Sequence, residues 1–179
     1  VVPLSPDACV WLREEKITVL HTVPSVMNSW IQTGLNEKGL PHLRWTFSAG
    51  EPLLNSLVER WRLIAPHTQI VNLYGPTETT LAKCFYRVPD YPQAGVQPIG
   101  QPLPDCAVMI IDSQMNLAGV GELGEIVIRT PFTSLGYLDS ADNETGSFFQ
   151  NPYAKDIEDW WYRSGDLGRI RPDGAIDIM

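Results

Sequence analysis

The sequence predicts an α/β fold in which a mainly parallel sheet is covered by helices, followed by a small, mostly antiparallel β region. Two observations predict it. Residues 1 to about 88 alternate short apolar runs with helical patterns, whereas Gly, Pro and Asp punctuate shorter runs in the later residues. Hydrophobic residues make up 44% and charged residues 19% of the 179 residues, which is typical of a globular chain. We assign 1–100 to the α/β part and 101–179 to the β-rich, barrel-like part.

The α/β part opens with a helix-start signal. Ser5-Pro6-Asp7 combines an N-cap residue, a proline for the first turn and an acid that complements the helix dipole, so a helix is predicted to about Lys16. The apolar, partly β-branched run 17–20 predicts a buried strand. Pro24-Ser25 then breaks the chain and caps a second helix, for which Gly34 is the predicted stop.

The same alternation then repeats. Run 43–47 predicts a second strand, and 69–73 predicts a third. Between them, an amphipathic helix is expected over 53–64, directly after Gly50-Glu51-Pro52. Strand-helix-strand-helix-strand is the signature of parallel units covered by helices, so the three strands are predicted to lie parallel.

The β-rich part contains shorter strands separated by turn residues. Five strands are expected, at 107–111, 125–129, 161–164, 168–171 and 175–179. The turn Pro172-Asp173-Gly174 predicts a hairpin between the last two. We therefore expect a small sheet or barrel with mainly antiparallel pairing.

Charge and cysteine content exclude several classes of protein. A net charge of −8 argues against broad binding to nucleic acid, although it permits binding of one small anion. No apolar run approaches the roughly 18 residues of a membrane helix, and no signal peptide is visible, so no membrane partner is expected. The three cysteines form no metal or disulfide pattern, which favours a cytoplasmic location; they are Cys9, Cys84 and Cys106.

The predicted topology indicates where a ligand would bind. Ligands of parallel sheets bind at the carboxyl ends of the strands. Three segments, at 21–24, 48–52 and 74–80, follow the three predicted strands. If the strands are neighbours, these segments converge at one edge of the sheet.

The third of these segments carries the strongest chemical signal. A strand enters the turn Tyr74-Gly75-Pro76, which is followed by three threonines and Glu78. Glycine allows the backbone to approach a ligand, threonine hydroxyls can donate to phosphate, and a carboxylate beside them suits Mg²⁺. Tyr74 offers a flat face for stacking. From the residues alone, a capped turn that begins a helix remains the alternative.

Two other segments allow both a structural and a functional interpretation. Ser48-Ala49-Gly50-Glu51-Pro52 is either a helix start with Pro52 in its first turn or a narrow wall against a flat ligand. Asp166, after Gly165, either closes a turn or accepts hydrogen bonds from a ribose. His21 at the end of an apolar strand is either a satisfied buried group or a catalyst, and the first is the more common of the two.

Three blocks together resemble a known family. Asn72-Leu73-Tyr74-Gly75-Pro76-Thr77-Glu78 resembles the N-x-Y-G-P-T-E signature of adenylate-forming enzymes. Residues 121–126 with 135–138 resemble their G-E-L and G-Y-L block, and 162–167 resembles Y-[KR]-T-G-D-L with Ser164 in place of Thr. The first block is most similar to adenylation domains of nonribosomal peptide synthetases. The resemblance covers essentially the whole chain and implies the fold of the large N-terminal subdomain of these enzymes.

The resemblance also implies that the chain is a piece of a longer polypeptide. The family's phosphate loop, which precedes these blocks, and its C-terminal subdomain with the catalytic lysine have no counterpart here. We expect the chain to begin inside a longer protein, because it starts without Met, and to end before the family's hinge.

The resemblance implies a role for each matching residue. Tyr74 would stack on adenine, with Gly50-Glu51-Pro52 as the opposite wall. Thr77 and Glu78 would be catalytic, Thr77 at the α-phosphate and Glu78 on Mg²⁺. The nucleotide would be bound by Gly50, Glu51, Pro52, Asn72, Tyr74, Gly75, Thr77, Asp166 and Ile178, the last at a position where the family often has an aromatic residue. The substrate pocket would be lined by His21, Phe47, Ala49, Leu73, Leu81 and Ala82.

The implied reaction joins a carboxylate, such as an amino acid, to ATP and passes the acyl group to a carrier protein. An acyl-adenylate and pyrophosphate form first, with Mg²⁺ and hydroxyl donors stabilising charge. The acyl group then moves to the phosphopantetheine thiol of a carrier domain in the same synthetase. One alternative is an acyl-CoA synthetase or fatty-acyl ligase with the same first step. Another is a non-catalytic piece that at most binds nucleotide, and we expect the 179 residues alone to be inactive.

Overall fold

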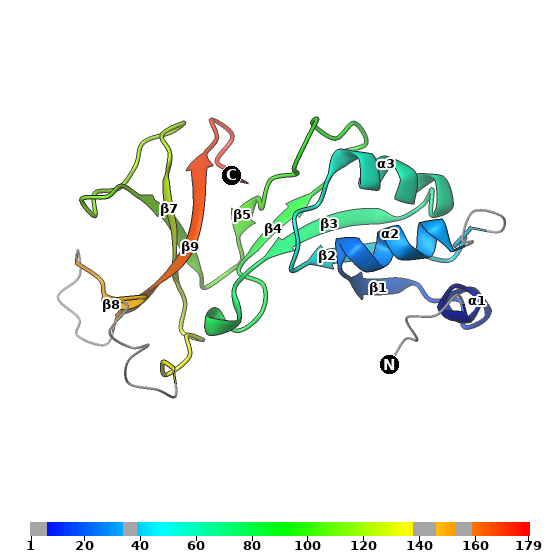
Figure 1. The fold of residues 1–179 in the computed structure, drawn as a ribbon, viewed down its shortest axis with the longest axis horizontal. Helices are drawn as coiled ribbons and strands as arrows, with labels where there is room; N and C mark the ends of the chain where they lie inside the picture. Colours follow the sequence, from blue (N-terminus) through cyan, green and yellow to red (C-terminus); the bar gives the residue numbers. More distant parts are fainter. Residues whose placement is uncertain (1–6, 34–38, 138–145, 153–158) are drawn as a thin grey trace. The chain divides into compact units, whose positions relative to one another are not determined.

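The computed structural model describes residues 7–33, 39–137, 146–152 and 159–179 (Figure 1). The chain forms two compact units. The first comprises Val1–Leu73 and Arg87–Gln97, and the second comprises Tyr74–Tyr86 and Pro98–Met179. Both the predicted cap at 5–6 and the predicted stop at Gly34 lie outside the described residues.

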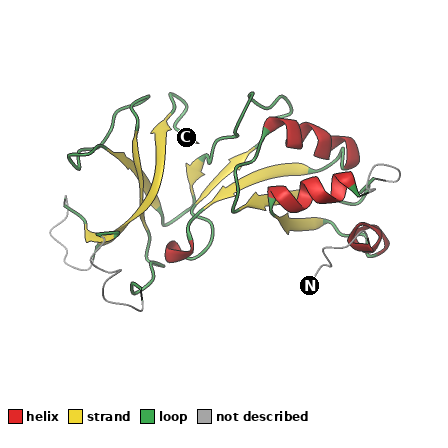
Figure 2. Cartoon of the chain, viewed as in Figure 1, coloured by secondary structure: helices red, strands yellow, loops and turns green. Residues whose placement is uncertain are grey.

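The first unit contains the predicted parallel strands and their helices. In chain order, the elements are α1 (Asp7–Glu14), β1 (Val19–Thr22), α2 (Pro24–Gln32), β2 (Trp45–Ala49), α3 (Asn55–Ile64) and β3 (Gln69–Tyr74, whose last residue lies in the second unit). β2 pairs in parallel with β1 on one side and with β3 on the other, which confirms the predicted parallel order. α2 and α3 lie over these strands in Figure 2, where helices are red. The strand order within this unit is β1-β2-β3.

Several predicted boundaries were wrong by a few residues. β1 and β2 both begin two residues later than predicted and extend to Thr22 and Ala49, because their registers are fixed by pairing with each other and with β3. The first helix ends at Glu14, and Lys16 has φ 51, a left-handed conformation that a helix cannot continue. α3 begins at Asn55, so Pro52 precedes the helix and is not part of its first turn.

Side chains alternate between the two faces of these parallel strands. One face is buried and carries Thr46, Ser48 and Ile70, each at most 1% exposed. The fully buried Trp61 of α3 packs on this face and donates a hydrogen bond from Nε1 to Thr46 Oγ1 at 3.0 Å. Fully burying an aromatic side chain of this kind contributes about 3 kcal/mol, so the Trp61 contact anchors α3 to the sheet.

The second unit is built from antiparallel strands, as predicted. Its elements are η2 (Thr77–Thr79), β4 (Cys84–Arg87, whose last residue lies in the first unit), β5 (Gln101–Pro102), β6 (Ala107–Ile111), β7 (Gly124–Arg129), β8 (Phe148–Gln150), β9 (Trp160–Ile170) and β10 (Ile176–Ile178). The order β10-β9-β7-β6 forms one sheet, with β8 paired to β9. β4, β5 and β8 were not predicted from the sequence. These strands have only two to four residues, too few for a hydrophobic period to stand out in the sequence.

β9 is one strand of 11 residues, not the two short strands predicted at 161–164 and 168–171. Arg163 pairs with Val127 and Leu167 pairs with Glu125, so three residues of β9 lie opposite Ile126 alone. This bulge contains Gly165, whose φ of 77 is the left-handed conformation that glycine adopts without strain. The glycine thus bends a continuous strand and does not end it.

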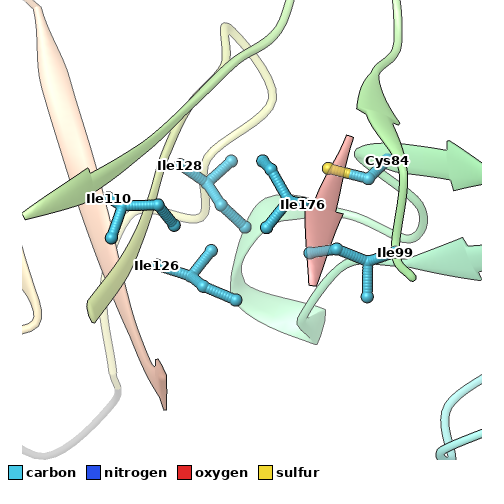
Figure 3. Packing of buried hydrophobic residues seen from close by; sticks show 6 residues of the cluster. All are labelled: Cys84, Ile99, Ile110, Ile126, Ile128 and Ile176. Atoms are coloured by element: carbon cyan, nitrogen blue, oxygen red, sulfur yellow. The ribbon is translucent and has the colours of Figure 1, made fainter. Parts of the chain in front are cut away.

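The core of the second unit is a cluster of isoleucines with one cysteine (Figure 3). The cluster contains Cys84, Ile99, Ile110, Ile126, Ile128 and Ile176, all at most 2% exposed. Tyr74 and Ile178 pack against it and are partly buried. The side chains therefore hold β4, β6, β7 and β10 together from residues that are far apart in sequence. In the part of the chain that the structure describes, no helix has the length and hydrophobicity needed to cross a membrane.

Candidate functional site

The site is centred on Tyr74, the last residue of β3, and on the tight segment that follows it. The Lys83 N–H donates to the Tyr74 carbonyl at 2.6 Å, which closes residues 74–83 into a loop. A Cβ on Gly75 would lie 2.0 Å from the Leu81 carbonyl oxygen. Gly75 is therefore required by the close approach of the loop backbone to itself, whereas the sequence had indicated only the approach of a ligand.

Tyr74 contacts the bulge of β9 directly. Its hydroxyl donates to Asp166 Oδ2 at 2.6 Å, across 92 residues of sequence. Burial raises the pKa of the Tyr74 hydroxyl above its ordinary value of 10, and the hydrogen bond to Asp166 acts in the same direction, so Tyr74 is a neutral donor at neutral pH. The two predicted residues, one for the base and one for the ribose, thus lie side by side.

Ser164 supports Asp166 from within the bulge. The Asp166 N–H donates to Ser164 Oγ at 3.1 Å, and Ser164 Oγ donates to the Ile126 carbonyl at 2.8 Å. Asp166 was expected to follow a glycine turn, but it lies inside β9. The bulge, rather than a turn, directs its carboxylate toward Tyr74.

Glu78 lies in the short η2 turn and is held from a distant segment. The Tyr137 hydroxyl donates to Glu78 Oε1 at 3.0 Å, and the Ser134 N–H donates to the Glu78 carbonyl at 2.7 Å. Burial raises the pKa of Tyr162 above 10, with hydrogen bonding to Tyr137 and the negative charge of Glu78 as further causes. Tyr137 and Tyr162 belong to recognised motifs, but sequence reasoning gave neither of them a role.

The residues present fit a magnesium ion only together with a phosphate ligand. Among the described residues, no group of three His, Cys, Asp or Glu side chains could hold a metal by itself. Mg²⁺ in nucleotide sites is typically bound by one or two carboxylates together with substrate phosphates, and a single carboxylate at Glu78 meets that requirement.

The three threonines of the loop differ in their availability. Thr79 Oγ1 donates to the Pro76 carbonyl at 3.0 Å, and Thr80 Oγ1 donates to the Phe132 carbonyl at 2.9 Å. Thr77 is exposed on the turn. Of the three hydroxyls, that of Thr77 is therefore the best placed to reach a bound phosphate.

In the first unit, the predicted wall 50–52 has a structural partner. Glu51 accepts hydrogen bonds from the Ser25 N–H at 2.8 Å and from Ser25 Oγ at 2.7 Å. Val23, the N-cap of α2, makes no capping bond through its side chain. The Glu51 carboxylate takes over this role, because it accepts a backbone N–H of the first turn and its negative charge complements the helix dipole. The predicted N-cap at Pro24-Ser25 was thus wrong by one residue. Gly50 takes a φ of 82 and, like Pro52, is exposed.

Asn72 and four of the predicted pocket residues lie on opposite faces of the parallel strands. His21 pairs with Phe47, and Ala49 pairs with Leu73, so these four side chains share one face. Asn72 lies on the other face and is 4% exposed, with Nδ2 3.5 Å from the Gln97 carbonyl oxygen.

The other predicted residues lie in the second unit. Leu81 is 76% exposed in the loop after η2, and Ala82 is partly buried. Ile178 lies on β10 and packs on the same buried cluster as Tyr74. The second unit also has a hollow of about 1090 Å³, lined by Arg129, Asp159, Trp160 and most of 130–136, which contains none of the predicted site residues.

The chain is similar to proteins of known class over nearly its whole length. Residues 1–138 match the family described as AMP-binding enzyme. Delta-poly-L-ornithine synthetase of Acinetobacter baumannii is 37% identical over 172 residues, which are 96% of this chain and 12% of that protein. The chain therefore spans only a small part of the length of this curated relative.

Two solved structures have the same fold. The Vibrio cholerae adenylation domain AlmE, solved with glycyl-adenosine-5′-phosphate, is 31% identical with a TM-score of 0.84, covering 100% of this chain and 34% of that one. PA1221, a nonribosomal peptide synthetase protein with adenylation and PCP domains, is 28% identical with a TM-score of 0.85, covering 99% and 36%. The α/β arrangement described above is thus that of adenylate-forming proteins.

Proposed function

The chain belongs to the AMP-binding enzyme family, and from this premise we propose that it forms part of an adenylation domain that activates an amino acid or related carboxylic acid with ATP. The observation that carries the proposal is the 2.6 Å hydrogen bond between Tyr74 and Asp166. It brings the two motifs that would hold a nucleoside into one site. The glycyl-adenylate in the AlmE structure supports the same chemistry.

The nucleoside would be held by the groups around this hydrogen bond. The Tyr74 ring, packed against the isoleucine core, offers one face to adenine, and Ile178 packs on the same core. Asp166 would accept from the ribose hydroxyls. Gly75 shapes the loop beneath the phosphates. The other residues implied for the nucleotide, Gly50-Glu51-Pro52 and Asn72, stay predictions of the family resemblance.

The reaction would proceed by attack of the substrate carboxylate oxygen on the α-phosphorus of ATP. The bond between the α-phosphorus and its bridging oxygen to the β-phosphate breaks, and pyrophosphate leaves with that electron pair. Thr77, exposed on the turn, would donate to an α-phosphate oxygen, which gains negative charge as the new bond forms. A magnesium ion held by Glu78 would supply further neutralisation of phosphate charge.

The substrate side chain would be met by six residues. Five are apolar and one is polar; they are Phe47, Ala49, Leu73, Leu81, Ala82 and His21. This composition favours a medium-sized side chain with at most one polar group. The acyl group would then pass to the phosphopantetheine thiol of a carrier domain in the rest of the synthetase, where secondary metabolites are assembled. Free Cys84 and Cys106 agree with a cytoplasmic setting.

The proposal is tested with the natural full-length polypeptide that contains these residues. ATP–pyrophosphate exchange is measured with each proteinogenic amino acid and with common keto, hydroxy and fatty acids. We expect one amino acid or close analogue to dominate, and thioester formation on the carrier domain with it. Exchange with no carboxylate overturns the proposal, and CoA-dependent thioester formation with a fatty acid favours an acyl-CoA synthetase. The 179 residues alone should give no pyrophosphate exchange. Exchange by these residues alone would contradict the expectation that they are inactive by themselves.

A further inference from the structure

Glu78 receives support from the segment around 134–137 and from β9. Its backbone carbonyl accepts from the Ser134 N–H at 2.7 Å, and its Oε1 accepts from the Tyr137 hydroxyl at 3.0 Å. Burial, and then the neighbouring Tyr137 and Glu78, raise the pKa of the Tyr162 hydroxyl on β9, so this hydroxyl lies beside both side chains. The Glu78 carboxylate, in a three-residue turn, is thus bonded by one phenol from elsewhere in the chain, and a second phenol lies beside it.

The two phenols are themselves held by aromatic packing. Phe148 lies opposite Tyr162 in the β8–β9 pair, with ring centroids 5.0 Å apart. Phe148 also meets the Tyr137 ring edge-on at 5.7 Å. Tyr162 is only 5% exposed. The ring positions, and hence the directions of the hydroxyls, are set by this packing before any ligand binds.

Hydrogen bonds that orient a carboxylate matter most when the carboxylate binds a metal ion that is also bound by a ligand. Side chains that hydrogen-bond a metal ligand orient it and tune its basicity, and their loss typically weakens metal affinity 10–100-fold. If Glu78 were only a surface acid, it would need no buried phenol beside it. Instead, Glu78 Oε1 is engaged by Tyr137 within a site that already contains Thr77 on the same turn.

We propose that Tyr137 and Tyr162 are positioning residues that orient the Glu78 carboxylate for the divalent cation accompanying ATP. This inference rests on the proposed function, because it takes Glu78 as the ligand of that cation. Both tyrosines act through Glu78 and do not themselves contact the reacting atoms. Their hydroxyls, rather than their rings, carry the effect, so a change to phenylalanine isolates it.

The test measures how strongly Mg²⁺ enhances ATP binding to the natural full-length polypeptide. ATP is titrated calorimetrically without carboxylate substrate, in Mg²⁺ and in EDTA, and the metal enhancement is the ratio of the two dissociation constants. Glu78→Gln should reduce the enhancement to about one. Tyr137→Phe and Tyr162→Phe should each reduce this ratio about tenfold. If the wild-type ratio is itself below about ten, each variant should reduce it to one. Their dissociation constants in EDTA should match that of the wild type.

Two controls separate positioning from a structural defect. A damaged nucleotide site would weaken ATP binding in Mg²⁺ and in EDTA alike and leave the ratio unchanged. Tyr91→Phe removes a hydroxyl from a side chain that is 94% exposed, so it should behave as the wild type. The two tyrosine variants test the inference independently if one of them folds poorly.

The outcomes distinguish this inference from the function on which it depends. If Glu78→Gln abolishes the enhancement but both tyrosine variants retain it, the positioning role is wrong and the proposed function stands. If the wild type shows no enhancement, or if Glu78→Gln retains it, Glu78 is not the ligand of the cation, and both the metal role and the inference are overturned.

Discussion

Tyr74 and Asp166 are joined by a hydrogen bond of 2.6 Å although 92 residues separate them in sequence. Tyr74 ends a strand of the parallel sheet, whereas Asp166 lies in the bulge of β9. The bond orients one oxygen of the Asp166 carboxylate, Oδ2, and fixes the edge of the Tyr74 ring.

Asp166→Asn should weaken binding of ATP more than binding of 2′,3′-dideoxy-ATP. The carboxylate of Asp166 is the proposed acceptor for the ribose hydroxyls, and a hydrogen bond to a charged group contributes about 1.5–3 kcal/mol. We therefore expect at least a tenfold loss for ATP and a small change for the dideoxy analogue, measured by calorimetry. Equal losses for both nucleotides would assign Asp166 a structural role through Tyr74 alone.

Gly75→Ala should strongly destabilise the second unit. Its Cβ would lie 2.0 Å from the Leu81 carbonyl oxygen and 2.8 Å from the Lys83 nitrogen, and backbone atoms cannot move aside cheaply. We expect a loss of about 3 kcal/mol or more in free energy of unfolding, measured with urea. Gly121→Ala is the matched control: its φ is 84 but no atom lies within 4 Å of its Cβ position, so it should lose only about 1–2 kcal/mol.

Arg62→Lys should destabilise the first unit even though it keeps the positive charge. The Arg62 guanidinium donates to three successive carbonyls, of Val88 at 3.0 Å, Pro89 at 2.9 Å and Asp90 at 2.8 Å. A lysine lacks the planar fork that reaches all three. Thermal and urea unfolding should show a loss of about 1–3 kcal/mol. Arg60→Lys, which removes one exposed bond to Asn28, should have a smaller effect.

Cys84 should resist alkylation in the folded protein, whereas Cys106 should react first. Cys84 is fully buried, and burial followed by the nearby Cys106 raises the pKa of the Cys84 thiol to about 12. Little thiolate therefore exists at neutral pH, and the thiolate is the reactive form. Cys106 is partly exposed. Iodoacetamide labelling followed by mass spectrometry should show this order, and urea should abolish it.

Asp112 should stabilise the protein in a pH-dependent way. Its Oδ1 accepts from the backbone N–H groups of Gln114 at 2.8 Å and Asn116 at 2.9 Å. The hydrogen bond from the Asn116 backbone, with those from the Asn116 side chain and Gln114, holds the pKa of Asp112 below its ordinary value of 3.8.

The sign of the effect follows from this lowered pKa. The contribution of Asp112 is fully present above about pH 4 and is lost as the pH falls through the lowered pKa of the folded state. Melting temperatures of the wild type and Asp112→Ala should therefore differ at neutral pH and converge in acid. A difference that stays constant down to the acid limit would contradict this assignment.

Much of the fold could be predicted from local pattern. β6 has the predicted bounds 107–111, and β3 differs from the prediction by one residue, because each is an apolar run between clear turn signals. The predictions failed where long-range pairing sets the outcome. β9 runs through Gly165, where sequence indicated a break, because a bulge opposite Ile126 accommodates the left-handed residue.

The sequence by itself determined the α/β alternation, the parallel order of three strands and the three motifs that point to a nucleotide. Only the tertiary structure decided that Asp166 meets Tyr74, that Tyr137 holds Glu78 and that Gly75 is required by the Leu81 carbonyl. The physical reason is the range of the forces involved. Periodicity and turn chemistry act within a few residues, whereas these contacts join segments that only the packing of the sheet brings together.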